Sequence, residues 1–138
     1  MINQFGNINW LSVTIAAVVY FLLGALWFTT FFKKQYARSL GKENEPNQKP
    51  EPIYILGPAL CIFVITLTSA LFLYKLNINS ISGAVEVSLI IGIGFLFANT
   101  MNIAINPNIP RPILYGIISG TYHLLGINFA SAIIVFMR

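Results

Sequence analysis

The sequence predicts an all-α fold: an integral membrane four-helix bundle with antiparallel up-down topology. Charged residues make up 9% of the 138 residues and apolar residues 57%, whereas about a quarter of a soluble domain is charged. Four long runs hold no charged residue, at 8–32, 53–74, 87–109 and 112–137, and roughly 20 helical residues cross a bilayer core. We therefore expect one transmembrane domain over residues 1–138, with spans at about 8–32, 53–74, 84–106 and 112–136 and a linker at about 33–52.

The first span, at 8–32, is expected to be retained, because its apolar run is longer than that of a signal peptide. Trp10 and Trp27 lie near its two ends, and Lys33 and Lys34 follow it directly. Tryptophan rings and lysine side chains are typical of the two membrane–water interfaces. We predict that these four residues anchor the span, and that the polar, proline-rich linker after them is solvated.

The basic residues predict how the chain is oriented. The expected topology places six of them on one side of the bilayer, namely Lys33, Lys34, Arg38, Lys42, Lys49 and Arg111. Only Lys75 and Arg138 are expected on the other side. Short loops rich in Lys and Arg stay in the cytoplasm. We therefore expect a cytoplasmic linker and both termini outside, in the periplasm or at the cell exterior.

The second span begins with Gly57 and Pro58, and the proline predicts a kink there. It also holds Cys61, the one cysteine of the chain. A single cysteine excludes an internal disulfide and a cysteine-based metal site. No cofactor and no metal are predicted, and the thiol is expected to behave as a small apolar group.

The third span carries small and amide side chains at alternating steps of four and three, which predicts a contact seam: Ser88, Gly92, Phe95, Asn99, Asn102 and Asn106. Unpaired amides are costly in hydrocarbon. We expect Asn99 and Asn102 to bond to a neighbouring helix; lining a polar cavity is the alternative. Glu86 lies off this seam near the start of the span, where a negative charge suits the helix dipole.

The fourth span carries Gly116 and Gly120 in a GxxxG spacing, which allows close helix approach. We expect it to meet the third span through these glycines and through Asn99 and Asn102. His123, the single histidine, falls near the middle of the span. A packed, neutral imidazole is favoured over a proton carrier or ligand contact, because no acidic partner is expected at its depth.

Short motifs spread along the chain combine aromatic residues with asparagine, glycine, lysine or histidine. They are Asn9-Trp10, Gly24-x-x-Trp27-Phe28 with the exit Phe32-Lys33-Lys34, and Tyr122-His123. In these motifs the chain resembles an uncharacterised bacterial four-span family, catalogued as domain of unknown function 1761. The resemblance covers essentially the whole chain. It implies a membrane fold and a location in the bacterial cytoplasmic membrane, and no established activity. Phe28 stands where members often have tyrosine.

Three function classes fit this pattern. We favour a small non-enzymatic membrane protein, an accessory or self-associating structural subunit, because the helices carry small-residue faces and no catalytic set is recognisable. The alternative is a minimal dimeric transporter or channel, and the second alternative is a small membrane enzyme that uses His123. The expected partners are the lipid bilayer and other subunits, in a homo-oligomer or a larger complex. No nucleic acid is expected, since the basic residues lie at span ends.

Overall fold

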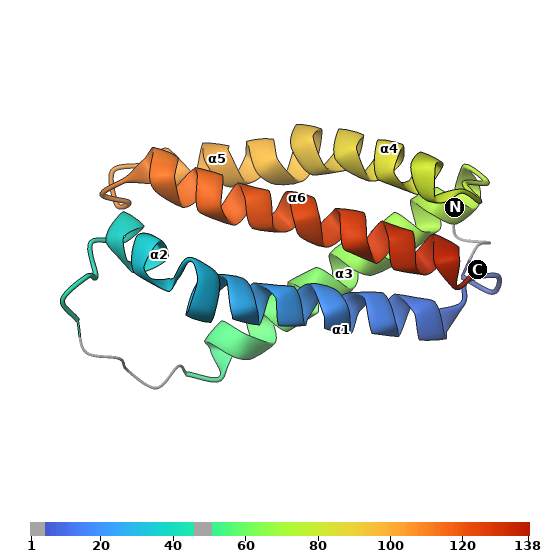
Figure 1. The fold of residues 1–138 in the computed structure, drawn as a ribbon, viewed down its shortest axis with the longest axis horizontal. Coiled ribbons are helices and arrows are strands. Elements are labelled where there is room, and N and C mark those ends of the chain that lie inside the picture. The colour runs from blue at the N-terminus through green and yellow to red at the C-terminus, as the bar shows by residue number, and fades with distance from the viewer. Residues whose placement is uncertain (1–4, 46–50) are drawn as a thin grey trace.

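The computed structural model describes residues 5–45 and 51–138 as helices joined by short turns, with no strand in these ranges (Figure 1). The all-α prediction is confirmed. The helices are α1 (Trp10–Leu26), α2 (Lys33–Ser39), α3 (Ile53–Lys75), α4 (Ile81–Ile91), α5 (Ala98–Ala104) and α6 (Pro112–Phe136), with π-helical segments η2 (Trp27–Phe31) and η3 (Gly92–Phe97).

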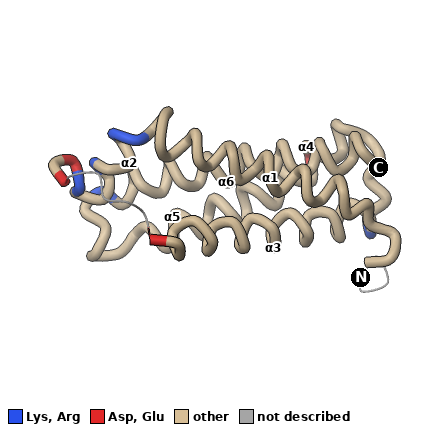
Figure 2. Tube along the Cα trace, turned by 90° about the horizontal axis from the view of Figure 1, so that it is seen from below, with Lys and Arg blue, Asp and Glu red and all other residues tan. Residues whose placement is uncertain are grey.

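Four continuous helices are long and apolar enough to cross a membrane. They run Trp10–Phe31, Ile53–Lys75, Ile81–Ala104 and Pro112–Phe136. The four spans alternate in direction, so both termini lie at one end of the bundle, hereafter the terminal end (Figure 1). Most Lys and Arg residues lie at the opposite end beside α2, hereafter the basic end (Figure 2). Lys49 lies outside the described residues.

Helix α6 is the centre of the bundle. Half of the residues in its most apolar 18-residue stretch are buried, whereas 17% are buried in the corresponding stretch of the third span. Its glycines admit large side chains from both neighbours: Gly126 lies against the ring of Tyr20 in α1, and Gly120 against the ring of Phe97. Gly116 faces Met101 of α5 in the same way. The expected close approach of the third and fourth spans at Gly116 and Gly120 is therefore present.

The predicted seam of the third span is wrong in its second half. Gly92 packs against α6 as expected, but further along the span the side chains that pack against Gly120 and Gly116 of α6 are Phe97 and Met101. The step from 92 to 97 is five residues, because η3 closes i→i+5 turns and advances the contact face by one residue. Asn99 and Asn102 are consequently exposed, and neither has a hydrogen-bond partner among the described residues. The prediction that they bond to the fourth span is corrected.

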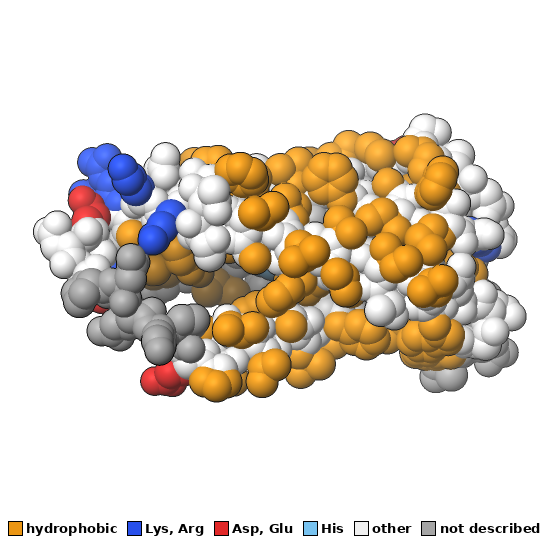
Figure 3. Space-filling view, turned by 60° about the horizontal axis from the view of Figure 1, so that its bottom comes forward, with side chains coloured by type: hydrophobic (Ala, Val, Ile, Leu, Met, Phe, Trp, Pro, Cys, Tyr) orange, Lys and Arg blue, Asp and Glu red, His pale blue; other side chains and the backbone are white. Residues whose placement is uncertain are grey.

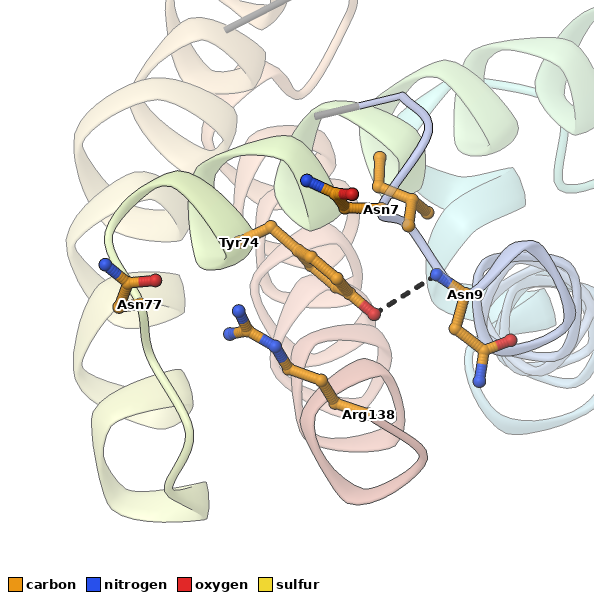
Figure 4. Close-up of a pocket in the computed structure, with 6 residues that line it drawn as sticks. Asn7, Asn9, Tyr74, Asn77 and Arg138 are labelled. Atoms are coloured by element: carbon orange, nitrogen blue, oxygen red, sulfur yellow. Dashed lines mark hydrogen bonds between the residues drawn. The ribbon is translucent and has the colours of Figure 1, made fainter. Parts of the chain in front are cut away.

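The terminal end is closed by hydrogen bonds between three helix ends (Figure 4). Asn9 caps α1 by accepting from the backbone N–H groups of Leu11 and Ser12. Its own backbone N–H donates to the hydroxyl of Tyr74 in α3 over 3.1 Å, and its side-chain amide donates to the Met137 carbonyl over 2.8 Å. The Arg138 guanidinium lies over the Tyr74 ring, 4.1 Å from its centroid. Asn9 and Tyr74 thus join α1, α3 and the end of α6.

The basic end is closed more loosely by the turn after α2. Gly41 ends that helix with a positive φ of 70°. The Arg111 backbone N–H donates to the Ser39 carbonyl over 3.2 Å. Its guanidinium pairs with Glu43 at 3.4 Å. These contacts hold α2 against the first turns of α6.

Candidate functional site

A cavity of about 490 Å³ lies in the half of the bundle next to the basic end. One wall is the first half of α3, from Gly57 to Ile62, and the opposite wall is α6, from Tyr115 to His123. Phe28 and Tyr36 close one side, and α5 closes the other with Thr100 and Ile103. Figure 3 shows the surface hollowed in this half of the molecule.

The cavity exists because α3 packs on the bundle only through its second half. Its buried residues begin at Ile62 and continue to Tyr74. Before that point Ile53 and Leu60 are 63% and 65% exposed, and a Cβ at Gly57 would meet nothing within 4 Å. Pro58 lacks a backbone N–H, which removes one hydrogen bond from the helix at this place. The first half of α3 therefore stands away from α6 and leaves a space open to the side.

His123 lies at the inner wall of this cavity and is held by α1. Its Nδ1 lies 2.8 Å from the hydroxyl of Tyr20, a fully buried side chain. The same hydroxyl lies 3.2 Å from the His123 carbonyl. If Tyr20 donates to Nδ1, the ring proton is on Nε2; if it donates to the carbonyl, Nδ1 carries the proton and Nε2 is an acceptor. The second nitrogen can thus serve as donor or acceptor.

Two polar atoms on the α6 wall have no hydrogen-bond partner among the described residues: Nε2 of His123 and Oγ of Ser119. Both atoms keep some exposed surface. Among the described residues, the one side-chain polar atom that is fully buried without a hydrogen-bond partner is Oγ1 of Thr66. Serine hydroxyls in helices commonly donate to a carbonyl one turn back. Ser69 does so over 2.8 Å. Ser119 instead keeps its hydroxyl free beside the cavity.

Aromatic rings form the side of the cavity next to the basic end. The ring centroids of Phe28 and Tyr122 lie 5.2 Å apart, those of Phe28 and Tyr36 4.7 Å, and those of Tyr36 and Tyr115 5.7 Å. These separations are within the range of favourable aromatic pairs. Burial, and then the neighbouring Tyr115, raise the pKa of Tyr36 to about 12. The Tyr36 hydroxyl is therefore a neutral hydrogen-bonding group near neutral pH.

The remaining predicted site residues lie elsewhere. Glu86 is exposed in the second turn of α4, near the terminal end, without an ion pair among the described residues. Trp10 is 46% exposed beside the terminal end, as an interface anchor would be. Trp27 is partly buried and donates its indole N–H to the Ile118 carbonyl over 3.1 Å, so it also joins the first span to the fourth. Lys33 and Lys34 are exposed at the start of α2.

Sequence reasoning missed the residues that hold α6 to its neighbours. Tyr20 was not singled out, although a tyrosine mid-span needs a partner for its hydroxyl. Asn128 was also missed; its Oδ1 accepts a hydrogen bond from Ser88 over 2.9 Å, joining α4 to α6. An intramembrane amide was a usable signal for Asn128. No group of three or more His, Cys, Asp or Glu side chains that could hold a metal ion occurs in the described ranges.

The family model described as "Protein of unknown function (DUF1761)" matches residues 11–135. The chain belongs to the DUF1761 family. The matched range contains all four spans except Trp10 and Phe136, the first residue of the first span and the last residue of the fourth. It contains both Gly24 and the Tyr122-His123 pair. No curated protein and no solved structure shows significant similarity to the chain.

Two of the motifs that carried the family resemblance meet in the structure. A Cβ at Gly24 would lie 2.6 Å from the hydroxyl oxygen of Tyr122. That hydroxyl donates to the Tyr20 carbonyl over 3.4 Å. The missing side chain at Gly24 therefore leaves the space that the Tyr122 hydroxyl occupies. His123 directly follows Tyr122 in α6, so this contact also helps to position His123. As a DUF1761 member the protein is a multi-pass membrane protein of unknown function.

Proposed function

We propose that the protein is a non-enzymatic subunit of the bacterial cytoplasmic membrane that associates with a second copy of itself. The contact surface in this proposal is the outward side of the third span, hereafter the amide face. Its members are exposed and lie on the side of the helix away from α6: Gly94, Phe95, Ala98, Asn99 and Asn102.

The observation that carries the proposal is the exposure of two amides on a membrane span. Asn99 and Asn102 are exposed and have no hydrogen-bond partner among the described residues. Asn99 lies five residues before Ala104, the last residue of the span, which is about 7.5 Å along the helix axis. Lipid tails cannot hydrogen-bond to an amide, so burial of these groups against protein is favoured.

A second copy is the partner that the chemistry of the face fits. An amide carries both a donor and an acceptor. Two identical amide faces related by a twofold axis can therefore satisfy each other, each interhelical bond contributing about 1 kcal/mol or less. Gly94 and Ala98 are four residues apart, and a Cβ at Gly94 would meet nothing within 4 Å. Such small residues allow two helices to approach closely.

The proposal is tested by cross-linking in native membranes. In a Cys61→Ala background, Asn99→Cys should form a disulfide-linked dimer on mild oxidation, because the two faces meet across the axis. Val64→Cys is the matched control; Val64 is 53% exposed on α3, which lies on another side of the bundle. The control should stay monomeric. Equal cross-linking of the two variants, or none from Asn99→Cys, would contradict the proposal.

A second measurement separates the role of the amides from mere proximity. The double variant Asn99→Leu, Asn102→Leu keeps a helix-forming, apolar surface but removes both amides. Its dimer fraction, measured by energy transfer between labelled subunits in lipid vesicles, should fall well below that of the unchanged protein. An unchanged dimer fraction would show that the amides do not hold the subunits together.

A further inference from the structure

We infer that the cavity beside the first half of α3 binds an uncharged, ring-headed amphiphile from the membrane, of the isoprenoid quinone type. The inference goes beyond self-association, because the cavity and the amide face use different sides of the third span. Its basis is the combination of shape, charge, depth and free hydrogen-bonding groups at one place.

The size and position of the cavity fit the head of a membrane-soluble ligand. Its volume of about 490 Å³ lies in the range of small-molecule sites, about 300–1,000 Å³. Pro58 and Cys61 on α3 and Ile103 on α5 are exposed at its rim, so the opening faces the lipid. An apolar tail can therefore remain in the bilayer while the head enters between the helices.

The charge of the described lining residues indicates which kind of head group the cavity can bind. None of the described residues that line the cavity is an Asp, Glu, Lys or Arg. Ser119 and His123 lie seven and eleven residues into α6, which is about 10 and 16 Å from its start at Pro112. A phosphate or carboxylate at that depth would need a compensating charge. A neutral head does not, and this excludes the charged headgroups of ordinary phospholipids from the inner wall.

The free polar atoms select a ring with hydrogen-bonding oxygens. The Ser119 hydroxyl has no hydrogen-bond partner among the described residues and can donate. His123 Nε2 can donate or accept, depending on whether Tyr20 donates its proton to Nδ1 or to the carbonyl. The aromatic side chains of Phe28 and Tyr115 form the side of the cavity next to the basic end, where a flat ring can stack. A quinone ring carries carbonyl acceptors and flat faces, and therefore matches both features.

Trp27 provides a reporter for the test. Its indole N–H binds the Ile118 carbonyl, one residue before Ser119, so a quinone in the cavity lies near enough to quench its fluorescence. Trp10 lies at the opposite end of the same span and is replaced by phenylalanine, which leaves Trp27 as the single tryptophan. This Trp10→Phe protein is reconstituted into phosphatidylcholine vesicles and titrated with decylubiquinone. Saturable quenching is expected, in the presence of excess phospholipid.

Two serine variants decide whether the wall of the cavity binds the head. Ser119→Ala should weaken the apparent affinity for decylubiquinone roughly three- to tenfold, the usual effect of losing one hydrogen bond. Ser131→Ala makes the same change about 18 Å further along α6, outside the residues that line the cavity, and should leave the affinity unchanged. The Trp27 emission spectrum without quinone verifies that both variants are folded.

Three results would overturn the inference. Quenching that rises linearly without saturation would mean that the quinone only partitions into the lipid. Equal affinities of the two serine variants for decylubiquinone would mean that the Ser119 hydroxyl on the cavity wall does not bind the quinone head. Displacement of decylubiquinone by an equal concentration of decanoate, which carries a charged head, would show that the site selects apolar chains or anions and not a neutral ring.

Discussion

The packing of Tyr20 against Gly126 leads to a quantitative prediction for Gly126→Ala. A Cβ built at Gly126 would overlap three carbons of the Tyr20 ring. Tyr20 is fully buried, and its hydroxyl is held 2.8 Å from His123 Nδ1. The ring therefore has to move and give up that bond. Overpacking costs about 1–3 kcal/mol and a lost hydrogen bond about 1 kcal/mol, so the free energy of unfolding should fall by about 2–4 kcal/mol.

The matched control is Gly94→Ala, the same substitution at a glycine whose Cβ would meet nothing within 4 Å. Alanine is the better helix former, so this variant should be neutral or more stable by up to about 1 kcal/mol. Both variants are unfolded by SDS in mixed micelles, at a protein concentration where they are monomeric, with helix content as the readout. Equal stabilities of the two variants would refute the packing argument.

Two further predictions concern the ends of the bundle. In a Cys61→Ala background on intact cells, an impermeant thiol reagent should label Asn79→Cys and not Asn44→Cys. The reason is that the six-to-two distribution of basic residues favours cytoplasmic retention of the linker. Labelling of Asn44→Cys and not of Asn79→Cys would show that the expected orientation is inverted. Tyr36 has its pKa raised from 10.0 to about 12 by burial and by Tyr115, so the unfolded chain loses this proton first and stability should fall as pH rises from about 10 to about 12. Tyr36→Phe should make alkaline unfolding in detergent less steep, and an unchanged pH profile would count against a buried hydroxyl.

The helices could be predicted from the sequence because their signals are local. A charge-free run long enough to span the bilayer needs no knowledge of its neighbours, and the predicted spans differ from the observed ones by at most three residues, at the start of the third span. The contact role of Gly116 and Gly120 followed from their spacing alone. Polar contacts between distant segments carry no such signal: Tyr20 and His123 are 103 residues apart. Nothing in the spacing of either residue identifies the other.

The failure at Asn99 and Asn102 has a different cause. The seam was extended through the third span on the assumption of a constant helical period. Six residues of η3 break that period, and a π-turn has no reliable sequence signature; it is recognised from its i→i+5 bonds. Beyond Gly92 every residue is rotated relative to the expected face. The error is therefore one of phase, and it changes which residues face lipid without changing the span itself.

This change of phase also links the two proposed surfaces. Phe97, the last residue of η3, and Met101 in α5 occupy the positions against the glycines of α6. Thr100 and Ile103 then line the cavity beside α3, while the two asparagines face outward. A regular α-helix would have turned the asparagines toward α6 instead. The π-helical segment thus adds one residue to one turn, an irregularity that is frequent at functional sites. As a result the third span has three separate sides: an apolar side against α6, a side that lines the cavity, and an amide side that faces outward.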